Sequence, residues 1–269
     1  MSSAASVSSV RDALAAAEDS LRAAGCDTPR LDAELLLADA MGVSRAALIT
    51  ADGVPPAAAR RAMELVRRRV AREPVAYILG SKGFRHIDLA VDRRVLIPRP
   101  ETERLVEVAL ELPSGARVHD VGTGAGAVAL ALKQERPDLA VSASDASADA
   151  VEVARANASA LGLDVPVELV PGLPPGDYDL VLANLPYVRE DEWRGLQPEI
   201  TRYEPREALV SGSDGLDAIR ALVAQAPAGL RLALEHAPDQ AAAVRDLLDD
   251  AETLRDLADR ERVTVGTAR

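Results

Sequence analysis

A four-residue run, Asn184-Leu185-Pro186-Tyr187, follows a largely apolar stretch at 178–183 and joins an amide, a rigid turn and an aromatic ring. Methyl transfer to a planar NH2 group needs acceptors that hold its hydrogens, because the nitrogen lone pair is delocalised. The Asn184 side-chain oxygen and the Leu185 carbonyl supply two acceptors, Pro186 fixes the turn, and the Tyr187 ring stacks on a planar group. We therefore predict that Asn184, Pro186 and Tyr187 are catalytic through positioning and electrostatics. For the tetrapeptide alone, an ordinary strand-end turn is the alternative.

A glycine-rich loop lies upstream and has the setting of a nucleoside site, between a predicted strand and a predicted helix. Its glycines let the backbone approach a ligand closely. Asp145 ends the next predicted strand, where a carboxylate accepts hydrogen bonds from ribose hydroxyls. Asp120 would place an anion near a sulfonium and an α-amino group, which favours S-adenosylmethionine over NAD. The predicted donor site comprises Asp120, Gly122, Thr123, Gly124, Ala125, Gly126, Asp145 and Asn184.

Composition narrows the function classes. The chain has 269 residues, a net charge of −12 and a single cysteine, Cys26. This charge disfavours nucleic acid, because binding to phosphates rests on basic groups. A local cluster of arginines at 60–72 forms either a solvated helix face or a basic face for an acidic partner. The three histidines lack metal-ligand spacing, so no metal is expected. We also expect no membrane segment, no secretory signal and a cytoplasmic location.

The periodicity predicts three regions. Residues 1–72 read as a small helical domain, with Ser9 and Thr28 as helix caps and Pro55-Pro56 opening an arginine-rich helix. Residues 73–101 read as a β-hairpin linker with short strands at 77–80, 87–91 and 95–97. From 102 to 269, strands alternate with helices, which predicts an α/β, doubly wound, mostly parallel sheet of the Rossmann-like type. The expected strands are 117–121, 140–144, 165–170, 180–183, 230–235 and 262–265.

The sequence resembles the protein-(glutamine-N5) methyltransferases, the PrmC/HemK family, over nearly its whole length. The segments that carry the resemblance are the Asn184–Tyr187 corner, a helical segment at 31–37, and linker signatures at 73–80 and 95–103. Tyr203-Glu204-Pro205 and the stretch 208–216 continue it. The resemblance implies a class I methyltransferase domain that uses S-adenosylmethionine and leaves S-adenosylhomocysteine. We expect a monomer, because the sequence shows no obvious assembly motif.

The same resemblance implies a peptide chain release factor as the protein substrate, with the helical domain helping to grip it. The acceptor would be the glutamine of its Gly-Gly-Gln loop, held by Asn184, Leu185, Pro186 and Tyr187. Leu185 departs from the family's usual proline, and we expect tolerance with some loss of rigidity. Ala237 stands where the family tends to have glycine. No adenine contact can be assigned in the short apolar segment 169–176.

Three other functions remain open from the residues. A nucleic-acid adenine methyltransferase would use the same corner, but base extrusion needs phosphate contacts that a net charge of −12 disfavours. Gly122, Gly124 and Ala127 also satisfy a relaxed NAD fingerprint, although hydride transfer leaves the Asn184–Tyr187 corner unexplained. A non-catalytic adaptor that binds the donor is the third.

Overall fold

A computed structural model describes residues 9–269; the segment 1–8, on which the expectation about a secretory signal rests, lies outside the described residues. The chain forms two compact units. One comprises the chain up to Gly80 together with Pro198–Tyr203, and the other comprises Ser81–Gln197 and Glu204–Arg269. These units differ from the expected segments 1–72, 73–101 and 102–269.

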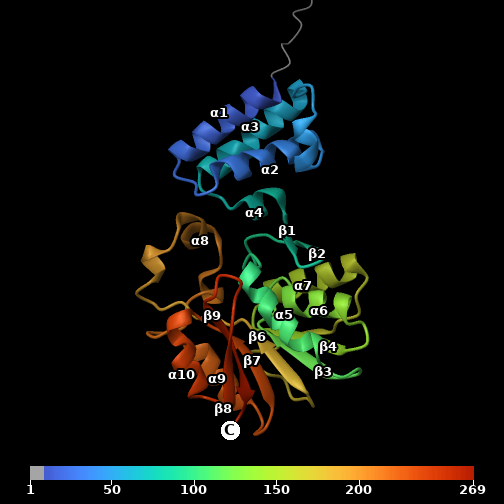
Figure 1. Ribbon diagram of the computed structural model, residues 1–269, viewed down its shortest axis with the longest axis vertical. Helices are drawn as coiled ribbons and strands as arrows, with labels where there is room; N and C mark the ends of the chain where they lie inside the picture. Colours follow the sequence, from blue (N-terminus) through green and yellow to red (C-terminus); the bar gives the residue numbers. More distant parts are fainter. Residues whose placement is uncertain (1–8) are drawn as a thin grey trace, which may run out of the picture. The chain divides into compact units, whose positions relative to one another are not determined.

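The larger unit is built on a seven-stranded sheet in the order β5-β4-β3-β6-β7-β9-β8 (Figure 1). The first five strands in that order are parallel, whereas β9 pairs antiparallel with both β7 and β8. This confirms the α/β, doubly wound, mostly parallel class. The strands are β3 (Arg117–Val121), β4 (Ala140–Asp145), β5 (Val167–Leu169), β6 (Leu180–Ala183), β7 (Arg231–Glu235), β8 (Asp249–Arg255) and β9 (Glu261–Thr267).

Helices cover both faces of this sheet (Figure 1). On one face, Ile219, Leu222 and Val244 join Val181 and Leu232 of the sheet in a single buried cluster. The central strand β6 is buried along its whole length, so its sequence is continuously apolar rather than alternating. The helices are α5 (Glu103–Leu110), α6 (Ala127–Glu135), α7 (Ala148–Leu161), α9 (Asp217–Gln225) and α10 (Ala241–Arg245), with 3-10 turns η2 (Pro100–Thr102), η3 (Trp193–Gly195), η4 (Arg206–Ala208) and η5 (Pro238–Gln240).

Two expectations for this unit need correction. The segment 95–97 is not a strand, because the backbone N–H of Ile97 donates to the Glu204 carboxylate at 3.1 Å instead of to a neighbouring strand. Strand β8 was not expected at all. It is polar and mostly exposed, as suits an edge strand, so it lacks an apolar pattern. The expected hairpin does form, from β1 (Ser81–Phe84) and β2 (Ile87–Ala90).

In the helical unit, α1 (Val10–Ala23), α2 (Pro29–Met41) and α3 (Pro56–Val70) pack pairwise around a shared apolar core (Figure 1). The Ser9 hydroxyl caps α1 by accepting from the Asp12 N–H at 3.1 Å, as predicted. Thr28 makes no side-chain cap to α2; its hydroxyl donates instead to Asp32 at 2.8 Å. The unit also contains η1 (Arg45–Ile49), α4 (Val75–Leu79) and α8 (Pro198–Tyr203).

The expected strand at 77–80 is instead the helix α4, followed by Gly80. A short apolar run does not distinguish a strand from one turn of helix. Packing decides between them here, because Ile78 joins Leu36 and Leu65 in a buried cluster of the helical unit. This contact is the physical reason why the compact unit extends past residue 72.

Several arginines in α3 and just after it form internal ion pairs. The Arg69 side chain is buried and donates to Asp32 at 2.7 Å and to Glu199 at 2.6 Å. Arg72 donates to the same Glu199 carboxylate at 2.7 and 2.6 Å. Because Glu199 belongs to α8, these pairs attach Pro198–Tyr203 to the helical unit. The basic cluster at 60–72 is therefore neither wholly solvated nor wholly free for a partner.

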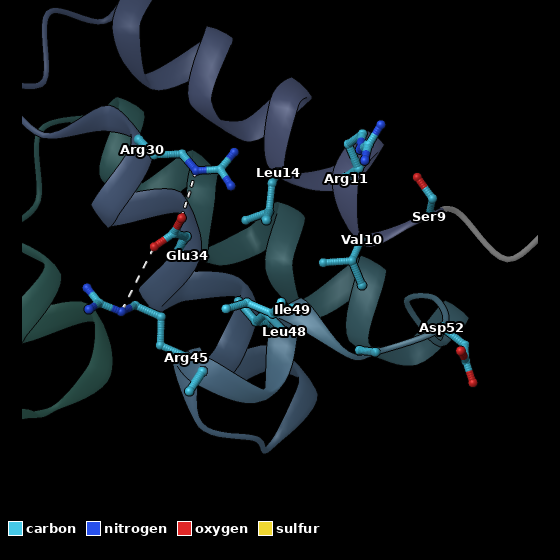
Figure 2. Close-up of a pocket in the computed structure, with 12 residues that line it drawn as sticks. Ser9, Val10, Arg11, Leu14, Arg30, Glu34, Arg45, Leu48, Ile49 and Asp52 are labelled. Carbon is cyan, nitrogen blue, oxygen red and sulfur yellow. Dashed lines mark hydrogen bonds and ion pairs between the residues drawn. The ribbon is translucent and has the colours of Figure 1, made fainter.

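A surface hollow of about 590 Å³ lies beside α1, α2 and η1 in the same unit. Figure 2 shows Glu34 between two arginines, and its carboxylate lies 2.7 Å from Arg30 and 3.9 Å from Arg45. Leu14 lines the same hollow, and the neighbouring Ile49 is 88% exposed. The hollow thus combines charged and apolar side chains.

Among residues 9–269, no helix has the length and apolar character that crossing a membrane requires.

The buried Arg69 cluster predicts a large effect of a single substitution. Arg69→Ala would leave Asp32 without its buried partner and remove one of the two arginines on Glu199. We expect the free energy of unfolding to fall by about 3–5 kcal/mol in urea denaturation. Arg61→Ala is the matched control: its pair with Asp39 is exposed, so the loss should stay below about 1 kcal/mol. Equal losses for the two variants would contradict this account.

Candidate functional site

The candidate site is set by the register of four parallel strands. Val121 of β3 pairs with Ser144 of β4 and with Ala183 of β6, and Ala183 in turn pairs with Leu234 of β7. The residue after each pairing position therefore falls in one row along the carboxyl edge of the sheet. That row is Asp145, Gly122, Asn184 and Glu235. It crosses β3 and β6, where the strand order reverses and open α/β sheets bind their ligands.

The glycine loop has the left-handed backbone that only glycine adopts readily. Gly122, Gly124 and Gly126 have φ values of 73°, 56° and 85°. The Gly124 N–H donates to the Asp145 carboxylate at 2.9 Å, so the loop is bound directly to the end of β4. Asn157 of α7 holds it from behind, donating to the Ala125 carbonyl at 2.9 Å. The sequence analysis did not identify Asn157.

A cavity of about 440 Å³ opens beside this row. Its lining contains Gly122, Gly124, Asp145, Asn184, Leu185 and Pro186, so six of the predicted site residues meet there. A smaller cavity of about 50 Å³ adjoins the loop and is lined by Asp120, Thr123 and Ala125, among others. Gly126 and Tyr187 line neither cavity. Gly126 is the N-cap of α6, and the Tyr187 hydroxyl donates to Glu235.

Asp120 is almost fully buried, with 2% of its surface exposed. Burial raises the pKa of its carboxyl to about 7, although the Thr123 hydroxyl donates to it at 2.6 Å and acts in the opposite direction. The preceding residue, His119, contacts Ser142 at 2.8 Å and Ser144 at 2.9 Å. Burial lowers the His119 pKa to about 4, so its ring is neutral and packed in the sheet. His119 is thus a structural residue of the sheet.

Asn184 follows β6 directly, and its amide is already fixed on one side. The Nδ2 group donates to the Thr102 hydroxyl at 2.9 Å, and Thr102 is 4% exposed. The carboxamide oxygen Oδ1 is therefore the end left for a ligand. Leu185 packs over the glycine loop: its side chain would lie 2.9 Å from a Cβ atom placed on Gly122. A side chain at Gly122 would therefore require Leu185 to shift, and the φ of 73° already disfavours any residue but glycine there.

Tyr187 is held through both its side chain and its backbone. Its hydroxyl donates to Glu235 at 3.2 Å, and its carbonyl accepts from the Gln240 side chain at 2.9 Å. A Cβ atom on Gly215 would lie 2.1 Å from that same carbonyl. Gly215, with a φ of 77°, is therefore needed both for its backbone conformation and for the close approach of the chain.

Thr102 and Glu235 are the polar residues beside the corner that the sequence analysis missed. Glu235 is 1% exposed, and burial raises the pKa of its carboxyl to about 7. Thr102 carried a signal, because it belongs to the linker signature at 95–103. Glu235 carried little signal: it is a single acid at the end of an apolar strand, and only the strand order places it beside Asn184.

Two other segments that carry the family resemblance, 95–103 and 203–205, meet at Glu204. Its buried carboxylate accepts from the Ile97 N–H and pairs with Arg99. Arg99 also lines the smaller cavity. The linker signature and the Tyr203-Glu204-Pro205 motif therefore support the same edge of the site.

Within residues 9–269, no cluster of three or more His, Cys, Asp or Glu side chains is arranged to hold a metal ion.

Comparisons with known proteins identify the family of the chain. Two family models match the chain: the PrmC N-terminal domain over residues 12–80 and the methyltransferase small domain over residues 101–201. The release factor glutamine methyltransferase of Xylella fastidiosa (strain Temecula1) is 46% identical over 255 residues, covering 88% of this chain and 92% of that protein. The one from Pseudomonas aeruginosa is 45% identical over 260 residues, covering 89% and 94%.

A solved structure, a methyltransferase from Pyrococcus furiosus, is 15% identical with a TM-score of 0.49, covering 77% of this chain and 95% of that chain. The two curated relatives match both the helical and the catalytic part of the sequence, which confirms the resemblance drawn from the linker and corner motifs. The chain belongs to the release factor glutamine methyltransferase family.

Proposed function

We infer that this enzyme transfers a methyl group from S-adenosylmethionine to the side-chain amide nitrogen of a glutamine in peptide chain release factors. We place that glutamine in the Gly-Gly-Gln motif. The observation that carries the inference is the position of Asn184, whose amide is fixed by Thr102 at 2.9 Å at the edge of the cavity that the glycine loop lines. Membership of the family supports the same reaction.

The residues around the cavity fit the donor. A Cβ atom on Gly124 would meet no protein atom within 4 Å, so this glycine leaves open space where it lines the cavity. Asp145 uses its two oxygens once each, for the N–H groups of Gly124 and Ser147 at 2.9 Å. A carboxylate has about four acceptor positions, so capacity remains for ribose hydroxyls. Val170 lines the same cavity and is our candidate for contact with the adenine ring.

Bound S-adenosylmethionine supplies a methyl group on a positively charged sulfur, and S-adenosylhomocysteine remains after transfer. The protein's part is to position the acceptor. Asn184 Oδ1 and the Leu185 carbonyl accept from the two NH2 hydrogens, so that the nitrogen lone pair faces the methyl carbon. Tyr187 stacks on the planar amide while Pro186 fixes the turn. The nitrogen releases one proton after attack, so no strong base is needed.

We propose that the helical unit, including the hollow in Figure 2, contributes to binding of the release factor. Its arginines and the exposed Ile49 offer both charge and apolar surface. We further propose a cytoplasmic monomer that does not bind nucleic acid directly. The single, buried Cys26 fits a reducing compartment, and the net charge of −12 disfavours phosphate contacts.

The open space at Gly124 gives a test of the donor site. Gly124→Ala should weaken binding of S-adenosylmethionine about tenfold in calorimetry, because the added methyl group enters the cavity. Gly162→Ala is the matched control. Gly162 has a similar φ of 66° and an equally open Cβ position, but it caps α7 and does not line the cavity. Equal loss of affinity in both variants would show that backbone strain, and not the cavity, is responsible.

The raised pKa of Asp120 predicts a pH dependence of donor binding. A cationic ligand favours the ionised carboxylate, so affinity should rise with pH up to about 7 and then level off. At lower pH, protonation competes with binding, and the affinity should fall toward tenfold per pH unit. Titrations from acid to neutral pH would measure this. Asp120→Asn should flatten the profile. A profile that stays steep in that variant would assign the titration to another acid, such as Glu235.

Transfer of labelled methyl from S-adenosylmethionine to purified release factor tests the reaction itself. We expect label on the factor with an intact Gly-Gly-Gln glutamine, and none when that glutamine is replaced. Asn184→Ala should lower the rate by at least about 100-fold, because one acceptor for the NH2 group is lost. Label on DNA or RNA adenine instead would identify a nucleic-acid enzyme. Donor binding with no transfer to either substrate would indicate an adaptor.

A further inference from the structure

The turn 256–260 joins β8 to β9 and lies at the edge of the sheet that carries the candidate site (Figure 1). Glu235, the last residue of β7, pairs with Val263 of the antiparallel strand β9. The residues that precede Val263 therefore continue past Glu235, beyond the carboxyl ends of the parallel strands. A protein that brings a glutamine to Asn184 must lie over this edge, so its surface comes close to the turn.

A side-chain contact attaches the turn to the acceptor corner. Arg260 donates to Glu101 of η2 at 2.9 Å. The next residue, Thr102, accepts from the Asn184 amide at 2.9 Å. The surface of the turn is therefore continuous with the residues that hold the acceptor oxygen.

Leu257 lies in this turn with its side chain in water. Its relative exposure is 108%, the highest of the exposed large apolar residues among 9–269. It lines a surface hollow of about 160 Å³ together with Pro100 of η2. Isolated apolar residues are common on protein surfaces, so exposure alone has no meaning for function. The position of Leu257 gives it meaning, because a bound protein substrate would cover this part of the surface.

Hydrogen bonds to Asp256 hold the turn in one conformation. The Asp256 side chain is 5% exposed, and its carboxylate accepts from the N–H groups of Ala258 at 2.9 Å and Arg260 at 3.0 Å. The Arg260 side chain donates to it at 3.0 Å, and the Asp256 N–H donates to the Arg260 carbonyl at 2.9 Å. Leu257 is thus presented by an ordered turn. Binding through it loses little conformational entropy.

The charged side chains around Leu257 pair with one another. The pairs are Arg260 with Glu101 and with Asp256, Arg104 with Glu107, and Arg255 with Asp259. Opposite charges therefore lie side by side around the turn and weaken each other's attraction for a partner. Apolar contact is the distinctive chemistry that this surface offers.

We propose that the turn 256–260 is a docking surface for the release factor, with Leu257 inserting into an apolar site on the folded domain that carries the acceptor glutamine. The proposal rests on the proposed function, because the position of Asn184 brings that domain to this edge of the sheet. The contact holds the protein around the glutamine and does not touch the reacting amide. It therefore contributes to affinity for the protein substrate and leaves the chemical step unchanged.

Leu257→Ser tests the surface in the labelled-methyl assay over a range of release factor concentrations. The KM for the factor should rise about tenfold, as for an apolar residue at the centre of an interface. The kcat and the Kd for S-adenosylmethionine should each change by less than about twofold, because a fully exposed side chain adds little to the fold. Leu257→Met keeps the apolar contact and should hold the KM within about threefold of the wild-type value.

Leu169→Ser is the matched control. Leu169 is also exposed, at 54%, but it belongs to β5, at the opposite end of the sheet from β8. Its KM for the release factor should change by less than about twofold. An unchanged KM in Leu257→Ser would overturn the proposal, as would an equal rise in both serine variants. A lower kcat at constant KM would also overturn it, because the turn would then act on the chemical step.

Light scattering tests the other use of an exposed leucine, which is contact with a second copy of this chain. We expect the wild type and Leu257→Ser to have the same mass at the assay concentration. A wild-type dimer that becomes a monomer in Leu257→Ser would assign the turn to self-association and overturn the proposal.

The wild-type assay keeps this inference separate from the proposed function. If the wild-type enzyme does not label the release factor glutamine, the proposed function fails and the docking surface fails with it. If the wild type labels that glutamine and Leu257→Ser does so with the same KM, only the docking surface is wrong.

Discussion

The pairing register of the parallel strands is the constraint on which the site depends. Backbone hydrogen bonds between β4, β3, β6 and β7 bring Asp145, Gly122, Asn184 and Glu235 into one row. Gly122 and Asn184 directly follow β3 and β6, and Asp145 and Glu235 are the last residues of β4 and β7. The row is therefore fixed by the backbone of the sheet. A one-residue slip in β6 would move Asn184 out of the row and turn the apolar strand over.

Burial of carboxyl groups is the cost of this arrangement. Asp120 precedes the row by two residues on β3, Glu235 belongs to the row, and burial raises the pKa of each carboxyl to about 7. Each is partly compensated by a hydroxyl donor, Asp120 by Thr123 and Glu235 by Tyr187. An apolar residue would pack more cheaply at either position. Local energetic conflict of this kind is expected where a fold is shaped by function.

The sequence was most informative where chemistry is local. Asn184–Tyr187 and the glycine loop follow strands directly, and turn residues mark those places in a single sequence. The position of Glu235 beside Asn184 could not be predicted in this way. It depends on which strand pairs with β6, and strand order is a property of the whole sheet. The prediction of a strand at 77–80 was wrong for another reason. A short apolar run is compatible with either a strand or one turn of helix, and the packing of Ile78 in the helical unit favours the helix α4. The edge strand β8 is too polar to carry a pattern.

The linker signature illustrates how motifs that are distant in sequence form one feature. Residues 95–103 resembled a connection between domains, yet they belong to the catalytic unit. Ile97 and Arg99 bind Glu204, and Thr102 binds Asn184. These contacts need specific side chains and a fixed backbone, which accounts for Pro98 and Pro100 on either side of Arg99. The segment that precedes the first helix of this unit is thus part of the acceptor site, because it supplies the hydroxyl on which the Asn184 amide rests.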